Sequence, residues 1–232
     1  MIIGARLFRF SLADLGFDRR YFIRNMGLGL CLGLFTFTIA YFLEFQILRS
    51  MGRSVVFQFY VTNFALTGSS SQATAAFLLL AICVAGNIIN VLVEEGLFRG
   101  LFLKLGADRF GFSKSNWIQA SLFGIWHIVM VVLGVREGLM DMSSAIVMAI
   151  GYVVLAGILG LLWGLCLSMT GSLWLGLSHH FFNNFIGNTL HVVTEVGADE
   201  MQIVRIVLSS LLSFFIVLIF RRSRLRIRLG ST

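Results

Sequence analysis

Residues 91–99 read VLVEEGLFR, and this stretch decides how the chain is interpreted. It lies in an apolar run from about residue 75 to residue 103, which is long enough to cross a bilayer at roughly 20 residues per crossing. Two adjacent carboxylates and a guanidinium are costly at membrane depth, so they indicate a functional site. Glu95 and Arg99 are four residues apart on one helix face and are predicted to pair. Glu94 points about 100° away in a regular α-helix and has no such partner in its own helix.

The composition is typical of a polytopic membrane protein. Of the 232 residues, 58% are hydrophobic and only 12% are charged, and the apolar residues form long runs. The net charge of +7 is interpreted as arginines in loops that face an anionic leaflet, so no nucleic-acid partner is expected. Cys31, Cys83 and Cys166 have no paired spacing, and neither a disulfide framework nor a zinc ribbon is predicted.

The predicted fold is all-α, a polytopic transmembrane helix bundle with about six crossings. Residues 1–25 alternate apolar and basic positions and are expected to form an amphipathic cytoplasmic segment, and 221–232 form a basic cytoplasmic tail. Between them, 26–220 form a single transmembrane domain. A short apolar piece at 55–66 is too short to span, and an interfacial or re-entrant role is expected. The expected crossings are about 26–48, 75–103, 116–135, 144–169, 172–193 and 203–220.

The distribution of basic residues predicts the orientation in the cell membrane. A cytoplasmic N-terminus places five basic residues before the first crossing, three in the loop 104–115 and five in the tail on the cytoplasmic side. The opposite side receives three arginines and the acidic loop 195–200. Both termini are therefore predicted to be cytoplasmic. Glu44, near the far end of the first crossing, is expected at the level of the lipid headgroups.

Four polar residues of three predicted helices lie at a similar depth. Counted from the cytoplasmic ends of their helices at ~1.5 Å per residue, Glu94, His127, His180 and Asn184 lie ~12 to 18 Å deep. A carboxylate in a low-dielectric site is suited to general-base work, and a nearby imidazole can orient a water molecule. A second imidazole and an amide can donate hydrogen bonds to a developing oxyanion. This set of residues is typical of a hydrolase that cleaves an amide bond.

Three motifs in order resemble a known family. They are Glu-Glu-x-x-x-Arg at residues 94–99, Phe-x-x-x-His at residues 123–127 and His-x-x-x-Asn at residues 180–184. Together they look like the CPBP family of CAAX prenyl endopeptidases and bacteriocin-processing enzymes, also called the ABI family. The resemblance covers about residues 85 to 190, and its register selects His180 over His179 and Asn184 over Asn183. Relatives often carry proline near these motifs, whereas this chain has none.

The resemblance implies an all-helical intramembrane endopeptidase of the glutamate type, without a cofactor. Glu94 would be the water-activating base and His127 would assist it. His180 and Asn184 would form the oxyanion site. The residues expected to orient the site or pack against it are Glu95, Arg99 and Phe123.

The expected partners are membrane lipid and a membrane-anchored or lipidated protein or peptide. A prenylated CAAX protein, a pheromone or bacteriocin leader, and a membrane-anchored sorting tail all remain open as substrates.

Two other functions stay open at this point. In the first, Glu94, His127 and His180 bind zinc in a membrane metallohydrolase, although no His-Glu-x-x-His motif is present. In the second, the chain is a non-catalytic membrane scaffold or regulator of the same fold, although a scaffold has no need of costly buried polar groups.

Several further polar residues have less specific interpretations. Asn87 and Asn90 share the helix face of Glu94 and are expected either to line a cavity or to bond between helices. His179 faces about 100° away from His180 and is interpreted either as structural or as a support behind the residues of the site. Asn188 and His191 continue the side of Asn184 toward the outer leaflet, and the sequence gives them no firm role.

Overall fold

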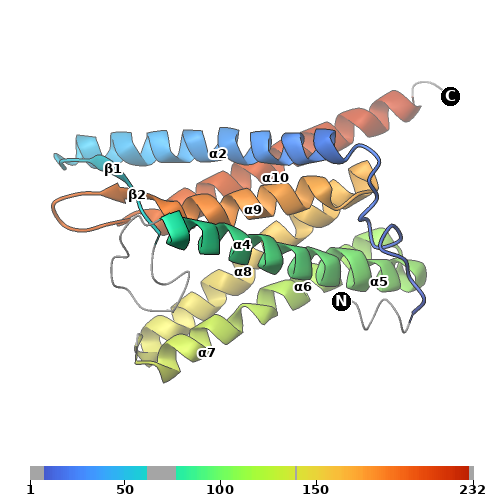
Figure 1. Ribbon diagram of the computed structural model, residues 1–232, viewed down its shortest axis with the longest axis horizontal. Coiled ribbons are helices and arrows are strands. Elements are labelled where there is room, and N and C mark those ends of the chain that lie inside the picture. Colours follow the sequence, from blue (N-terminus) through green and yellow to red (C-terminus); the bar gives the residue numbers. More distant parts are fainter. Residues whose placement is uncertain (1–7, 62–76, 139, 230–232) are drawn as a thin grey trace.

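The computed structural model describes residues 8–61, 77–138 and 140–229, with side chains described up to residue 223. Nine helical segments and two short strands follow one another in these ranges (Figure 1). The strands are β1 (Val56–Phe59) and β2 (Leu190–Val193). The helical segments are α2 (Phe22–Ser50), α4 (Phe77–Glu94), η1 (Glu95–Phe102), α5 (Leu103–Phe110), α6 (Phe112–Trp126), α7 (Ile128–Arg136), α8 (Met142–Thr170), α9 (Trp174–Thr189) and α10 (Gln202–Leu229).

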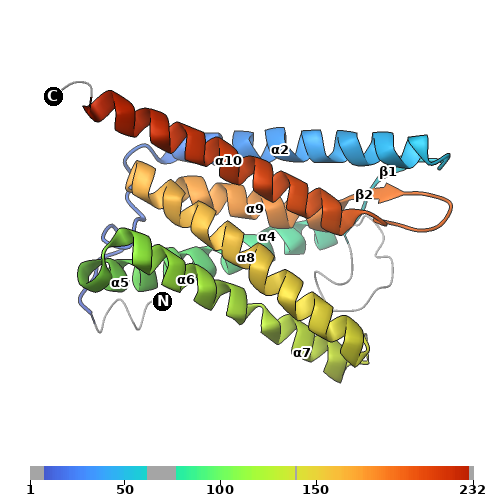
Figure 2. The ribbon, with the colours of Figure 1, turned by 180° about the vertical axis from the view of Figure 1, so that it is seen from behind.

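The helices confirm the predicted all-α polytopic bundle. Five helical stretches are long and apolar enough to cross a membrane, and α9, with 16 residues, is shorter than these. The chain runs back and forth between two ends of the bundle (Figures 1 and 2). The basic end holds the start of α2, the α5–α6 and α8–α9 turns and the C-terminal part of α10. The strand end holds β1, β2 and the α7–α8 loop.

The N-terminal segment packs on the basic end of the bundle. Residues 8–21 form turns and not a helix, and Leu15 is buried against Leu101. Gly16, whose φ is +92°, accepts a hydrogen bond at 2.9 Å from the backbone N–H of Leu173. The indole N–H of Trp174 donates to the carbonyl of Asp18 at 2.7 Å. The segment thus ties the start of α9 to the end of η1.

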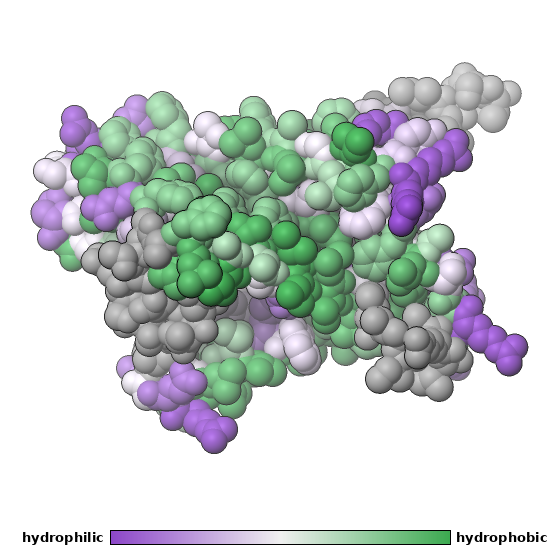
Figure 3. Space-filling model, viewed as in Figure 1, coloured by the Kyte–Doolittle hydropathy of each residue, from purple (hydrophilic) through white to green (hydrophobic). Residues whose placement is uncertain are grey.

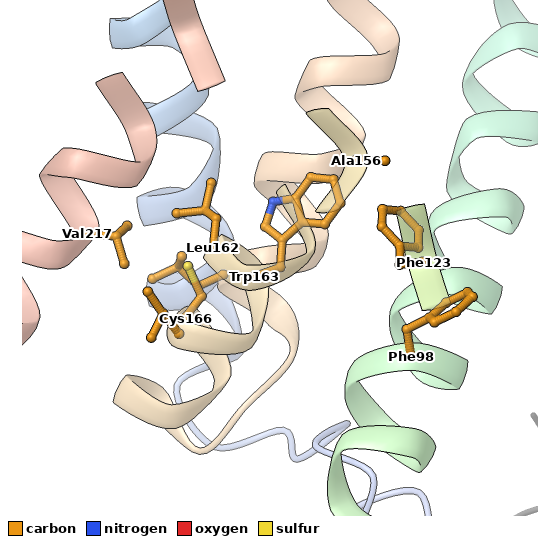
Figure 4. Close-up of a cluster of buried hydrophobic side chains, with 9 residues drawn as sticks. Phe98, Phe123, Ala156, Leu162, Trp163, Cys166 and Val217 are labelled. Atoms are coloured by element: carbon orange, nitrogen blue, oxygen red, sulfur yellow. The ribbon is translucent and has the colours of Figure 1, made fainter. Parts of the chain in front are cut away.

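The core lies where α8 crosses α6, and it includes Trp163 and Phe123 (Figure 4). A close approach of the two helices makes this packing feasible. A Cβ at Gly164 would lie 1.8 Å from Oδ1 of Asn116, so only glycine fits there. The side-chain amide of Asn116 donates to the carbonyl of Leu161 at 3.2 Å, so this polar side chain has a hydrogen-bond partner between the two helices.

The strand end differs from the sequence-based expectation. The predicted fifth crossing continued to residue 193, but α9 ends at Thr189 and residues 190–193 form β2. β2 pairs antiparallel with β1, with Val56 opposite Val193 and Phe59 opposite Leu190. Within the apolar piece 55–66, residues 56–59 are therefore neither helical nor re-entrant, and residues 62–66 lie outside the described ranges. Two short strands satisfy each other's backbone groups where the chain leaves the helical bundle.

A buried charge network lies beside this sheet. Glu44 is only 3% exposed, and Nη1 of Arg205 lies 2.7 Å from its Oε2. Nη2 of Arg205 lies 2.8 Å from Oδ1 of Asp199, whose Oδ2 lies 2.5 Å from Nδ1 of His191. Burial alone would raise the pKa of Asp199, but hydrogen bonds from His191 and Arg205 outweigh it and hold that pKa below its usual value. Its partner on α10 thus draws Glu44 into the protein, and its expected depth at the level of the lipid headgroups stays a prediction.

The two ends give a direct test of the predicted topology. Single cysteines at Ser54, Ser113 and Ser223, in a background with Cys31→Ala, would be treated with a membrane-impermeant maleimide in intact cells. The native Cys83 and Cys166 are buried and serve as the unlabelled background. We expect labelling at position 54 only, with positions 113 and 223 reacting after permeabilisation, because basic loops stay in the cytoplasm. Labelling of position 223 with protection of position 113 would contradict six crossings.

Candidate active site

The two adjacent glutamates lie where α4 passes into a π-helix. α4 ends at Glu94, and η1 begins at Glu95 without a break in the chain direction. The wider turn of a π-helix changes the angle between neighbouring side chains from the value in an α-helix, and such turns are frequent at functional sites. Nothing in the sequence pattern predicted it. Because the chain contains no proline, the regular α-helix is interrupted at the Glu-Glu-x-x-x-Arg motif by this π-helix and not by a proline kink.

Both glutamates reach the same imidazole. Oε1 of Glu95 lies 3.0 Å from Nδ1 of His180, and Oε2 of Glu94 lies 3.5 Å from Nε2. Glu94 has no partner in its own helix, as expected, but α9 supplies one across the bundle. His180 is thus the link between the two carboxylates, and neither of its ring nitrogens is left over for another group.

Glu95 and Arg99 form the predicted ion pair. Both residues are fully buried, and Nη1 of Arg99 lies 3.2 Å from Oε1 of Glu95. The guanidinium also lies 4.0 Å from the ring centroid of Phe123 and 4.9 Å from that of Trp163. A cation between aromatic faces in a desolvated site is stabilised by the ring quadrupoles. The ion pair and these rings together hold the charge of Arg99 in the membrane.

Trp163 orients the site, and the sequence analysis missed it. Its ring stacks on His180 with centroids 3.9 Å apart and an interplanar angle of 15°. Its indole N–H donates to Nδ1 of His179 at 3.1 Å, and Nε2 of His179 lies 3.0 Å from Oγ of Ser213. These contacts agree with the structural role predicted for His179. A tryptophan in an apolar helix carries no sequence signal that separates such a role from ordinary packing.

His127 lies at the junction of α6 and α7. Its Nδ1 lies 2.8 Å from the carbonyl oxygen of Phe123, which can only accept, so Nδ1 carries the proton and donates. In the neutral ring Nε2 is then an acceptor. The ring of His127 meets the ring of Phe123 edge-on, with centroids 4.6 Å apart. Phe123 therefore fixes both the tautomer and the orientation of His127, beyond the packing role expected for it.

A cavity of about 700 Å³ opens beside Glu94. The surface in Figure 3 is hollowed below α4, where hydrophilic side chains lie within a mostly apolar face. Glu94, His127 and Asn184 line the cavity, whereas His180, 3% exposed, lies behind it. Of the four predicted catalytic residues, three thus share the cavity and the fourth contacts Glu94. The other lining residues are Ile82, Cys83, Gly86, Asn87, Asn90, Trp126, Val129, Met130 and Asn188.

The zinc alternative concerns three residues whose surroundings the structure describes. Across residues 8–61, 77–138 and 140–229, no three His, Cys, Asp or Glu side chains gather in a way that could hold a metal ion. Glu94, His127 and His180 were the alternative ligands. Nε2 of His180 lies toward Glu94, itself one of these ligands, and Nδ1 of His127 donates to a carbonyl, as the second ring nitrogen of a metal-bound histidine commonly does. Metal analysis therefore decides the zinc alternative.

The buried pair predicts how Glu95 and Arg99 contribute to stability. Glu95→Gln leaves the guanidinium of Arg99 without its counter-ion, and breaking a buried pair typically costs about 3–5 kcal/mol. We expect a lower melting temperature in detergent for Glu95→Gln and partial recovery in the double variant Glu95→Gln with Arg99→Met. The exposed acid Glu137→Gln serves as the control. Equal melting temperatures for Glu95→Gln and the wild type would show that the pair does not support the fold.

Comparison with known families identifies the domain that carries these motifs. Residues 74–186 match the family model described as "Type II CAAX prenyl endopeptidase Rce1-like". No curated protein and no solved structure matched the chain. The matched segment runs from just before α4 into α9 and contains all three motifs and the residues of the site. Residues 74–186 therefore form an Rce1-like domain, similar to the type II CAAX prenyl endopeptidases.

Proposed function

We propose that this protein is an intramembrane endopeptidase in which Glu94 activates a water molecule for attack on a peptide bond. The observation that carries the proposal is the different placement of the two glutamates. Glu94 is the one carboxylate among the described residues that line the cavity, whereas Glu95 is fully buried, ion-paired with Arg99 and in contact with His180. Only Glu94 combines access to a substrate with a site of low dielectric, which suits a general base.

His127 and Asn184 complete the reaction site in this proposal. The acceptor Nε2 of His127 orients the water while Glu94 takes its proton, and the resulting hydroxide attacks the carbonyl carbon. The amide N–H of Asn184 donates to the oxyanion that develops. Glu94 then passes its proton to the nitrogen of the leaving group, and the carbon–nitrogen bond breaks.

His180 acts through Glu94 in this scheme. The sequence-based expectation placed His180 with Asn184 at the oxyanion, but its ring nitrogens face Glu95 and Glu94 and it does not line the cavity. We therefore assign it to positioning the carboxylate of Glu94. Trp163, stacked on its face, fixes the plane of the ring. The oxyanion role then falls to Asn184 alone.

The proposed setting is the cell membrane, with membrane lipid around the bundle and a membrane-anchored or lipidated protein or peptide as substrate. A cavity at membrane depth with polar groups on one wall suits a polypeptide segment that is already held at the bilayer. The charged and hydrogen-bonded site also separates this proposal from a scaffold of the same fold. A scaffold would retain its role when Glu94 is neutralised.

The variant Glu94→Gln tests the assignment of the base. It removes the proton acceptor and keeps the shape of the side chain, so we expect peptide cleavage to fall by at least about 10²-fold, the scale of general-base catalysis. The melting temperature should stay close to that of the wild type, in contrast to Glu95→Gln. Cleavage and melting would be measured on the same detergent preparation, with Glu137→Gln as the matched control. Full activity of Glu94→Gln would overturn the proposal.

Metal removal tests the zinc alternative separately. If Glu94 activates water without a metal, activity should persist in strong chelators, and the purified protein should carry no stoichiometric zinc. Metal analysis and cleavage would be measured before and after chelation and again in His127→Ala. About one zinc per chain, lost together with activity in His127→Ala, would establish the metallohydrolase instead.

A further inference from the structure

The cavity has a wall of asparagine amides that the proposed reaction does not use. Asn87 and Asn90 extend this wall along α4 from Glu94, and Asn188 extends it along α9 from Asn184. The opposite side is apolar and includes Trp126 and Met130. Polar side chains at membrane depth are costly unless they bond, and they mark functional positions.

These amides are available to a ligand. Asn90 and Asn188 make no side-chain hydrogen bond to the described part of the chain, and Asn87 donates only to the carbonyl and the sulfur of Cys83 in its own helix. Each amide offers donors and an acceptor, the same groups that a peptide backbone must satisfy. A substrate segment inside the membrane has no water to supply those partners.

The spacing of the amides fits an extended chain. Asn90 and Asn87 are four and seven residues from Glu94, or ~6 and ~10 Å along the helix. An extended peptide advances about 3.3 Å per residue, so the two amides lie beside the second and third residues from the bond that is cut. On the other side of Glu94, buried Phe98, Arg99 and Trp163 fill the bundle. The wall therefore extends from Glu94 only toward the strand end.

The wall also lacks a positive charge. None of the described lining residues is lysine or arginine. Arg99 is fully buried and paired with Glu95, so it cannot serve a ligand. A carboxylate held ~10 Å from Glu94 would meet like charge and no counter-ion, and unscreened repulsion is stronger away from water.

From these observations we infer that Asn87, Asn90 and Asn188 bind the backbone of an extended, uncharged segment next to the bond that is cut. The inference rests on the proposed function and names its substrate class. The site takes the uncharged interior of a polypeptide and discriminates against a chain end or acidic residue that brings a carboxylate against the wall.

Three peptides test the inference, each an S-farnesylcysteine peptide with a fluorophore and a quencher on either side of the bond after the cysteine. The first has only uncharged residues and ends in an amide after three further residues. The second ends there in a free carboxylate, and the third carries aspartate three residues before the bond and ends in an amide. We expect the wild type to cleave the first with the highest kcat/KM. At least one charged peptide should be tenfold poorer, and that peptide identifies the side of the bond that lies along the wall.

Introducing a positive charge into the wall tests whether the wall causes the poorer cleavage of the charged peptide. Asn87→Lys should improve cleavage of the impaired charged peptide at least threefold relative to the uncharged one. Gln46→Lys, which places the same charge in an exposed amide position on α2, should not. Asn87→Leu should raise KM for the uncharged peptide with little change in kcat. Equal cleavage of all three peptides by the wild type, or no relief by Asn87→Lys, would overturn the inference.

The same measurements distinguish a failure of the proposed function from a failure of this inference. Cleavage that survives Glu94→Gln, or no cleavage of any of the three peptides by the wild type, counts against the proposed function. Cleavage that Glu94→Gln abolishes but that ignores the peptide charge leaves the proposed function in place and removes only this inference.

Discussion

One carboxylate oxygen with two partners organises the site. Oε1 of Glu95 contacts both Arg99 and His180, and Arg99 and Glu95 are removed from solvent. A buried charge must be neutralised by groups at fixed positions, because no water can rearrange to do it. The π-helix therefore places Arg99 between aromatic rings, and α9 brings His180 to the same oxygen. Because Arg99 and His180 hold Glu95 inside the bundle, Glu94 is the carboxylate that faces the cavity.

The same constraint recurs at the strand end. Arg205 lies between Glu44 and Asp199, and Asp199 also contacts His191 at the start of the sheet. This network joins α2, α10 and the β2 segment, while the Glu95 network joins η1 and α9. The bundle is thus fastened by paired charges at two depths, and the cavity lies between helices that these networks hold. Apolar contacts with lipid cannot supply such specific distances, because lipid tails are as apolar as the helix surfaces.

The sequence predicts much of this arrangement. Apolar runs and basic loops locate the helices, and the four-residue spacing of Glu95 and Arg99 predicts their pair. The similar depth of Glu94, His127 and Asn184 anticipates their place on one cavity. The features that the sequence does not predict depend on contacts between segments that are far apart in the chain. The stacking of Trp163 on His180 and the pairing of Glu44 with Arg205 join positions on separate helices, which periodicity within one helix does not relate.

The sequence pattern also does not predict two local irregularities of the helices. The π-helix from Glu95 to Phe102 and the end of α9 at Thr189 lie in runs that are apolar enough to continue as α-helix. Their geometry follows from the tertiary partners, namely Arg99 between its rings and β2 beside β1. Propensity along the chain is a weak guide where such partners decide.

The division of the site between α4 and α9 has a consequence during synthesis. Glu94 precedes His180 and Asn184 by more than 80 residues, and α6, α7 and α8 are made between them. A nascent chain that has inserted only α2 to α8 holds Glu94 without His180 and Asn184, the residues proposed to position the base and to bind the oxyanion. The strands that join residues 56–59 to residues 190–193 likewise form only after α9 has left the ribosome. If Glu94, His180 and Asn184 act as proposed, peptidase activity would begin only late in biogenesis, after α9 has been made.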